Sequence, residues 1–209
     1  MTARIAVLDY GIGNLRSAEK ALQHVGADAR LVTTAAETDG AAGVVLPGVG
    51  AFGRCMEALR ESGLDAVTKD AVRSGRPFLG ICVGMQMLYE GSEEDPGVAG
   101  LGVLPGMVRR LAPGVKHPQM QWNVLEVARP SPLLDGLPDP AWVYFVHSYA
   151  PEASPEGAEV AATCEYGGPV VAAVARDNVW ATQFHPEKSG AAGLRLLANF
   201  AAACGARAA

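Results

Sequence analysis

The chain has 209 residues, of which 49% are hydrophobic and 19% are charged, and its net charge is −5. This length suits one domain, residues 1–209, with a core of its own, and the composition excludes a disordered chain. The longest uncharged stretch, residues 40–53, is too short for a membrane-spanning helix, and the acidic balance without a basic block argues against nucleic-acid binding.

The first half of the chain alternates between short apolar runs and amphipathic segments. Apolar residues recur at helical spacing over 15–25, and Gly26 is placed to end that helix. A second helical pattern covers 56–74 and is broken near Gly63. Strands are predicted over 4–8, 29–33, 43–46 and 78–81. This alternation predicts parallel strands with helices on both faces of the sheet.

The second half is richer in strands. Strand-like runs cover 102–111, 122–127, 142–145, 160–164, 170–175 and 179–184, with a hairpin connection at 166–168. A last apolar helix is predicted over 190–204, and loops over 90–100, 113–121 and 151–157. The predicted fold class is therefore α/β, with a mostly parallel central sheet flanked by helices and an additional antiparallel segment in the second half.

The pentapeptide Gly80-Ile81-Cys82-Val83-Gly84 follows a predicted strand and precedes a helical run, MQMLYE. This is the pattern of a nucleophile on a sharp strand-to-helix turn, with Cys in place of Ser. Side chains at the two glycine positions would collide with the neighbouring strand and helix. The start of the helix favours the thiolate of Cys82, and the Val83 N–H is placed to stabilise an oxyanion. A buried structural cysteine on a glycine-rich turn is the alternative.

A thiol nucleophile needs a base, and the chain has four histidines. His24 falls on the first predicted helix, His117 in a proline-flanked loop, and His147 after an aromatic strand, where a structural role is sufficient. His185 follows the strand run and precedes Pro186 and Glu187. In an extended segment residues i and i+2 point to the same side, so the sequence predicts an imidazole oriented by the Glu187 carboxylate.

The segment Pro47-Gly48-Val49-Gly50 directly follows a buried strand. A glycine-rich loop at a strand end lets backbone N–H groups approach a ligand closely. The phosphate-loop pattern with its lysine is absent, so we expect this loop to supply the second half of an oxyanion hole. A tight turn without function is the alternative.

The runs GICVGMQ, PGVGAFG and QFHPEKS, in this order, resemble the class I (triad) glutamine amidotransferases, whose fold is flavodoxin-like. The resemblance covers essentially the whole chain. It implies that Cys82 attacks the side-chain amide of glutamine, that His185 moves the proton, and that Glu187 orients His185. It also implies an oxyanion hole at Val49, Gly50 and Val83, and glutamine binding by groups matching Gly50, Gln86, Glu94, Ser148 and Tyr149.

The opening DYGIGNL, the run YFVHSY and Lys188 are similar to one subgroup of this family. In that subgroup the glutaminase forms a heterodimer with a cyclase subunit, a (β/α)₈ barrel that receives the ammonia. Trp122, Asn123, Tyr144 and Lys188 match positions at that interface. The subgroup commonly has His and Gly where Gln119 and Gln121 stand in this chain.

Three other functions stay open: the same chemistry for another acceptor such as chorismate, hydrolysis of peptides or small amides, and a non-catalytic binding module. No metal or organic cofactor is predicted, since the histidines lack ligand spacing and the dinucleotide fingerprint is missing. The four cysteines form no C-x-x-C and the N-terminus does not resemble a signal peptide, so we expect reduced thiols and a cytoplasmic protein.

Overall fold

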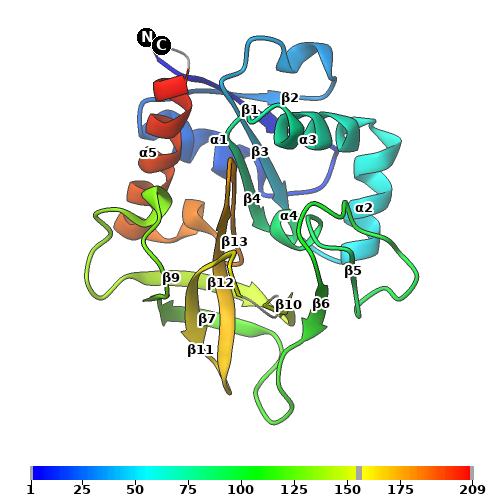
Figure 1. The fold of residues 1–209 in the computed structure, drawn as a ribbon, viewed down its shortest axis with the longest axis vertical. Helices are drawn as coiled ribbons and strands as arrows, with labels where there is room; N and C mark the ends of the chain where they lie inside the picture. The colour runs from blue at the N-terminus through cyan, green and yellow to red at the C-terminus, as the bar shows by residue number, and fades with distance from the viewer. Residues whose placement is uncertain (1, 154–156, 208–209) are drawn as a thin grey trace.

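The computed structural model describes residues 2–153 and 157–207. Among these residues, eight strands form the largest sheet (Figure 1). Their spatial order is β2 (Asp28–Val32), β1 (Arg4–Leu8), β3 (Gly43–Gly48), β4 (Phe78–Cys82), β13 (Val179–Thr182), β12 (Pro169–Arg176), β11 (Val160–Glu165) and β8 (Glu126–Val127). The first five strands are parallel and the last three continue antiparallel, which confirms the predicted fold class.

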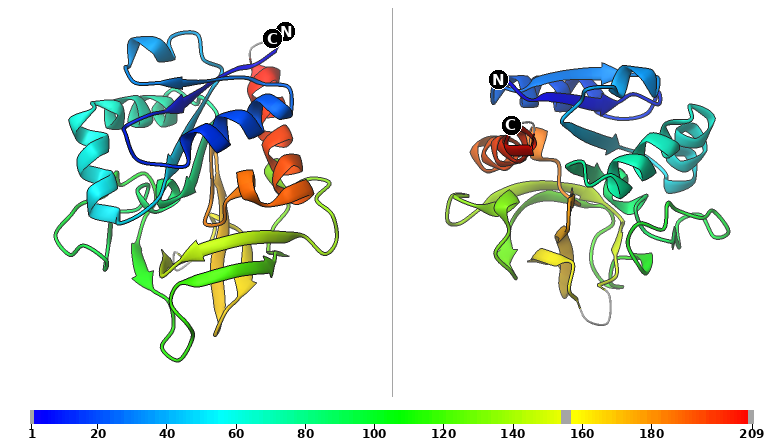
Figure 2. Two further views of the ribbon diagram at one scale, coloured as in Figure 1. Left: turned by 180° about the vertical axis from the view of Figure 1, so that it is seen from behind. Right: turned by 45° about the horizontal axis from the view of Figure 1, so that its top comes forward.

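Helices cover both faces of the parallel half. The helices and 3-10 turns are α1 (Leu15–His24), η1 (Ala36–Thr38), α2 (Phe52–Glu61), α3 (Leu64–Arg73), α4 (Val83–Gln86), η2 (Pro132–Leu134), η3 (Pro186–Lys188) and α5 (Gly190–Arg207). α1 and α5 pack on one face, and α2 and α3 lie on the opposite side (Figures 1 and 2). The order β2-β1-β3-β4-β13 is the flavodoxin-like order, in which ligands bind beyond the carboxyl ends of the strands.

Two small sheets lie beside the antiparallel half. One pairs β7 (Gln119–Val124) with β9 (Trp142–His147), and the other has the order β10 (Tyr149–Pro151), β6 (Met107–Arg110) and β5 (Gly91–Ser92). β7 and β9 are antiparallel, with Trp122 opposite Tyr144. Because strand residues alternate between two faces, β9 buries Val143, Phe145 and His147, while Tyr144 and Val146, which lie between them on the other face, are partly buried.

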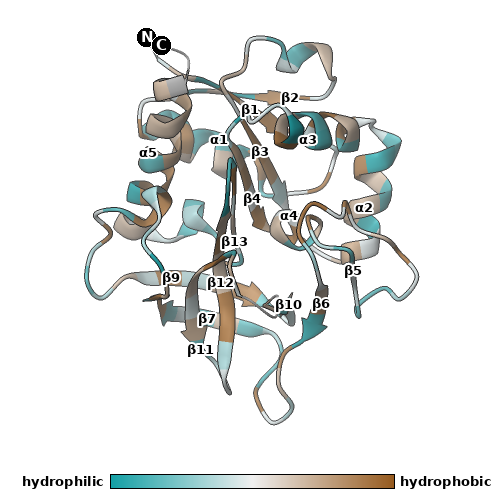
Figure 3. Ribbon diagram, viewed as in Figure 1, coloured by the Kyte–Doolittle hydropathy of each residue, from teal (hydrophilic) through white to brown (hydrophobic). Residues whose placement is uncertain are grey.

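The core follows from the apolar strands. All residues of β3 and β4 are buried, as predicted for strands covered on both faces. Figure 3 shows hydrophobic colours along the central strands, while α2 and α3 alternate between polar and apolar segments. No helix in residues 2–153 and 157–207 is long and apolar enough to cross a membrane.

Several predicted boundaries are wrong. The helical segment predicted over 56–74 begins earlier, at Phe52, whereas its predicted break near Gly63 is confirmed: Gly63, with φ 72°, separates α2 from α3. The strand predicted over 102–111 shortens to β6, because the N–H groups of 102–104 donate to carbonyls of residues 88–89. β7 begins at Gln119, inside the loop predicted over 113–121. Residues 154–156 of the loop predicted over 151–157 lie outside the described residues.

Candidate active site

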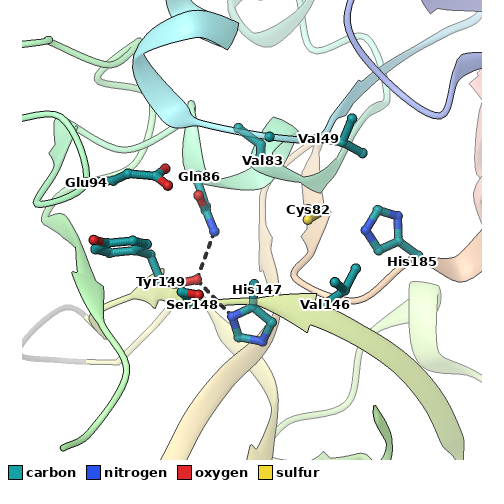
Figure 4. Close-up of a pocket in the computed structure, with 11 residues that line it drawn as sticks. Val49, Cys82, Val83, Gln86, Glu94, Val146, His147, Ser148, Tyr149 and His185 are labelled. Carbon is teal, nitrogen blue, oxygen red and sulfur yellow. Dashed lines mark hydrogen bonds between the residues drawn. The ribbon is translucent and has the colours of Figure 1, made fainter. Parts of the chain in front are cut away.

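Cys82 is the last residue of β4 and lies directly before α4. Its φ of 56° and ψ of −113° put a non-glycine residue in a strained backbone conformation, which costs about 1–3 kcal/mol and persists only where the surrounding structure enforces it. Cys82 is 3% exposed and its sulfur faces a cavity (Figure 4). The strand therefore ends in a sharp turn that presents the thiol.

The two glycines of this turn are needed for space. A Cβ on Gly80 would lie 2.9 Å from the carbonyl oxygen of Gly84. A Cβ on Gly84 would overlap the carbonyl oxygen of Leu46 on β3. Real Cβ atoms essentially never approach this closely, so the predicted collision of flanking side chains with the neighbouring strand and helix is confirmed.

The helix after Cys82 is much shorter than the predicted run MQMLYE. α4 has four residues and ends at Gln86. The reason is a competing set of hydrogen bonds: the carbonyls of residues 87–90 accept N–H groups from residues 100–104, which fold back over this segment. The first free N–H groups of the turn still lie next to Cys82.

His185 and Glu187 form a buried pair. The Nδ1 of His185 lies 2.8 Å from Oε1 of Glu187, and their side chains are 2% and 1% exposed. The carboxylate can only accept, so Nδ1 carries the proton and Nε2 is left toward Cys82, as Figure 4 shows. The contact does not arise from an extended segment, as the sequence argument assumed, because Glu187 lies in the 3-10 turn η3.

The charges of the pair stabilise each other. Burial by itself lowers the pKa of His185, but hydrogen bonding and charge attraction from Cys82 and Glu187 outweigh it and raise that pKa to about 10. Burial raises the pKa of Glu187, yet its hydrogen bond and attraction to His185 bring the net pKa below the ordinary value. The site therefore favours a protonated imidazole beside a carboxylate.

Asn14 is a residue that the sequence argument missed. It precedes α1, and its Nδ2 donates to the same Oε1 of Glu187 at 3.0 Å. The contact joins residues 173 positions apart in the chain. The only sequence feature that marks Asn14 is the run DYGIGN, and hydrophobic periodicity assigns no function to that run.

The predicted site residues surround one cavity of about 160 Å³ at the carboxyl ends of β3, β4 and β13 (Figure 4). It is lined by Val49, Gly50, Cys82, Val83, Gln86, Glu94, Val146, His147, Ser148, Tyr149 and His185. Glu187 stands behind His185 and does not line it. The structure thus brings together every residue predicted for the triad, the oxyanion hole and glutamine binding, and adds Val146 and His147.

The cavity has a polar and an acidic end. Gln86 donates from its Nε2 to the Tyr149 carbonyl at 2.9 Å and to Oε1 of Gln183 at 3.0 Å. Glu94 accepts the N–H of Phe52, the first residue of α2, at 2.8 Å, so its carboxylate is held at the cavity. An amide and a carboxylate facing the nucleophile suit a small ligand that carries an amide and an ammonium group.

His147 also lines the cavity but is held by its own backbone. Its Nδ1 lies 2.8 Å from the Tyr149 carbonyl, so Nδ1 is the protonated nitrogen. Burial lowers the pKa of His147 to about 4; the hydrogen bond to Tyr149 offsets only part of this, and the neighbouring His185 adds a smaller lowering. A neutral histidine fixed in this way is a structural group, as its strand position indicated.

The Pro47–Gly50 loop is anchored from behind by two buried side chains. Tyr10 donates its hydroxyl to the Pro47 carbonyl at 2.7 Å, and Cys55 its thiol to the Val49 carbonyl at 3.2 Å. In a trans peptide the N–H points opposite to the carbonyl, so the anchored carbonyls aim the following N–H groups away from these anchors. Gly50, with φ 88°, completes the turn at the cavity.

The four residues matched to a subunit interface lie near one another on β7, β9 and η3. Trp122 is 48% exposed and its ring contacts Tyr144 edge-on, with centroids 6.0 Å apart. Asn123 donates its amide to the Glu165 carbonyl at 2.9 Å, and Lys188 is exposed. The main chain of Tyr144 accepts the N–H of His185 at 3.0 Å.

The two glutamines that depart from the subgroup occupy different surroundings. Gln119 is fully buried and donates its amide to the sulfur of Cys164 at 3.7 Å. Gln121 is exposed and, being one residue from Trp122, projects from the opposite face of β7. Within the part of the chain that the structure describes, no cluster of three or more His, Cys, Asp or Glu could hold a metal ion.

Comparison with known proteins gives consistent similarities. A family profile described as "Glutamine amidotransferase class-I" matches residues 6–204. The "Imidazole glycerol phosphate synthase subunit HisH" of Desulfitobacterium hafniense (strain DSM 10664 / DCB-2) is 51% identical over 196 residues, which cover 94% of this chain and 92% of that protein. The protein of the same description from Deinococcus radiodurans is 50% identical over 198 residues, again 94% and 92%.

Solved structures are similar over nearly the full length. One described as "Crystal structure of glutamine amidotransferase" has a TM-score of 0.76 and 27% identity, and covers 96% of this chain and 98% of its own. Another, "Structure of PurLQS from Thermotoga maritima", has a TM-score of 0.77 at 21% identity, with the same coverage, and is similar in fold.

Proposed function

The chain belongs to the class-I glutamine amidotransferases, and on that premise we propose that it is the glutaminase subunit of an imidazole glycerol phosphate synthase. Its relatives of that description are about half identical to it over nearly the whole chain. One observation carries the chemistry: the Cys82 sulfur and Nε2 of His185 face each other at one cavity, with Glu187 2.8 Å behind the imidazole.

The first half-reaction transfers the glutamyl group to the enzyme. His185 takes the proton of Cys82, and the sulfur attacks the side-chain amide carbon of glutamine. The tetrahedral intermediate collapses when the C–N bond breaks and the imidazolium gives its proton to the departing nitrogen, which leaves as ammonia. Glu187 stabilises the imidazolium throughout, which agrees with the raised pKa of His185.

The second half-reaction restores the thiolate. His185 removes a proton from water, the hydroxide adds to the thioester carbonyl, and the C–S bond breaks to give glutamate. The negative oxygen in both steps needs donors, and we assign them to N–H groups of Val83 and of the Val49–Gly50 loop. Removal of one such donor typically costs about 10²–10³ in rate.

Glutamine binding is assigned to the groups at the far side of the cavity. Glu94 pairs with the α-ammonium, and Gly50, Gln86, Ser148 and Tyr149 surround the remainder of the molecule. Both donor contacts of Gln86 are made within the protein, so its side-chain oxygen is the atom left to accept from the ligand. Support comes from the position of these groups around one cavity.

The ammonia is assigned to a cyclase subunit that forms a heterodimer with this chain and folds as a (β/α)₈ barrel. There it yields imidazole glycerol phosphate and an aminoimidazole carboxamide ribonucleotide, in histidine biosynthesis. Trp122, Asn123, Tyr144 and Lys188 are assigned to the interface, supported by the exposed aromatic pair on β7 and β9. The whole chain acts as one domain in the cytoplasm, in keeping with its four free cysteines.

A glutamine analogue with a diazo-ketone in place of the amide tests the nucleophile. We expect one covalent adduct per chain, located on Cys82 by peptide mass spectrometry, and none in Cys82→Ala. Cys204→Ala removes a buried thiol from α5 instead and should be labelled like the wild type. Labelling of the Cys82→Ala chain, or no labelling of the wild type, would refute Cys82 as the nucleophile of a glutaminase. Peptide or small-amide hydrolysis and a non-catalytic binding module would then be the remaining functions.

The acceptor is tested separately. Glutamate release is measured with the chain alone and with its cyclase and nucleotide ligand, and a large gain is expected only in the complete mixture. Growth of a histidine auxotroph lacking this subunit should be restored by the chain. Failure there, together with restored growth of a strain lacking the glutaminase of chorismate amination, would favour the second acceptor.

A further inference from the structure

We propose that Gln183 is a further catalytic residue, whose side-chain amide donates a hydrogen bond to the Cys82 sulfur and holds it as the nucleophile. This inference rests on the proposed glutaminase chemistry and adds a group to it. The Nε2 of Gln183 lies 3.7 Å from the sulfur of Cys82, within hydrogen-bond range for sulfur. Gln183 is fully buried and Cys82 is 3% exposed.

The fold delivers Gln183 to this position. β13 runs parallel beside β4, and Thr182 pairs with Ile81, so the next residue along each strand is Gln183 and Cys82. Gln183 lies in the bend directly after β13, and its N–H still donates to the Ala172 carbonyl of β12 at 2.8 Å. The same short segment thus brings two side chains to Cys82, the amide of Gln183 and the imidazole of His185.

The orientation of the Gln183 amide follows from its neighbours. The Tyr149 carbonyl can only accept, so the group of Gln86 that faces it at 2.9 Å is the NH₂. That NH₂ also faces Gln183 at 3.0 Å, so the atom of Gln183 on this side is the oxygen. The NH₂ of Gln183 then points to Cys82. A backbone carbonyl thus sets the direction of a chain of donors that ends at the sulfur.

A donor at this position acts on the charged form of the nucleophile. A hydrogen bond to an anion favours the anion over its protonated form, and charge-assisted bonds are about twice as strong as neutral ones. Together with His185, the amide also limits the directions in which the thiolate can point. The same amide chain reaches Gln86 at the glutamine-binding side, which couples the nucleophile to that wall of the cavity.

Two substitutions separate the donor from its packing. Gln183→Glu keeps the side-chain size and the oxygen that accepts from Gln86, but removes the N–H that faces Cys82. Gln183→Met keeps the volume but has neither the oxygen nor the N–H. For both we expect kcat for glutamine to fall about 10- to 100-fold. The pH midpoint for iodoacetamide alkylation of Cys82 should rise by about one unit, which corresponds to a tenfold loss of thiolate. Gln119→Met is the matched control, because it deletes the same kind of bond, 3.7 Å from buried Cys164.

A folded Gln183→Met or Gln183→Glu chain with the wild-type pH profile of Cys82 alkylation would overturn the inference. So would a Gln119→Met chain whose alkylation midpoint shifts as much as that of the Gln183 variants. If neither variant folds, the wild-type chain decides: the side-chain ¹⁵N–H₂ signal of Gln183 must move when Cys82 is alkylated, and an unmoved signal overturns it. Alkylation needs no glutamine, so a wild-type chain that alkylates but releases no glutamate counts against the glutaminase proposal alone.

Discussion

Replacement of Gly84 by alanine tests how closely the nucleophile turn is fitted to β3. The new Cβ would overlap the Leu46 carbonyl oxygen and lie 2.9 Å from its carbonyl carbon. Ordinary contact needs about 3.5–4.0 Å, and the oxygen is the closer of the two atoms, so α4 and β3 must separate by more than about 1 Å. Overpacking of this kind costs about 1–3 kcal/mol, or about 2–12 °C in Tm for a chain of this size.

The same movement separates the two halves of the proposed oxyanion hole, since Val83 belongs to α4 and the Val49–Gly50 loop follows β3. A displacement near 1 Å can lower a rate about 10²-fold, so we expect that loss in kcat for glutamate release. Gly205→Ala in α5 is the control, because nothing lies within 4 Å of its Cβ; it should leave kcat unchanged. A Gly84→Ala chain with wild-type Tm and kcat would refute the steric argument.

Three further changes have defined outcomes. Asn14→Ala removes a partly buried hydrogen bond to Glu187 and should lower kcat about tenfold with little change in KM, whereas an unchanged kcat would make Asn14 a structural residue only. The His185 contribution to the free energy of unfolding should be full below pH 6.5 and disappear as pH rises to about 10, because the folded pKa is raised. Urea titrations of wild type and His185→Gln measure it, and a pH-independent difference contradicts it. Trp122→Ala should weaken the cyclase complex at least tenfold by calorimetry, and an unaltered Kd would remove Trp122 from the interface.

The parts of the site that follow from local spacing were predictable. The turn at Cys82 is marked by a glycine two positions before it and another two positions after it. A Cβ at either glycine would clash with backbone atoms of a neighbouring element. His185 and Glu187 are two residues apart, so either an extended segment or a 3-10 turn can bring their side chains into contact. Here the 3-10 turn does so, and the prediction named the right pair for the wrong backbone reason.

Contacts between distant segments could not be predicted in the same way. Asn14 and Glu187 meet because β1 and β13 end at the same edge of the sheet, which depends on strand order. Gln183 had a usable signal, since it stands two residues before His185, but its partner Cys82 is known only from the pairing of β13 with β4. The short α4 was missed because the competing donors come from residues 100–104.

The two sides of Tyr144 have different environments. Its ring lies against Trp122 on the exposed surface, while its peptide accepts the N–H of His185 and donates to the hydroxyl of Ser189, each at 3.0 Å. A binding partner that displaces this ring also displaces the Tyr144 backbone, to which the N–H of His185 is hydrogen-bonded. The exposed ring and the catalytic imidazole are thus separated only by the backbone of β9. A displacement at the surface reaches His185 without passing through a hinge or through intermediate residues.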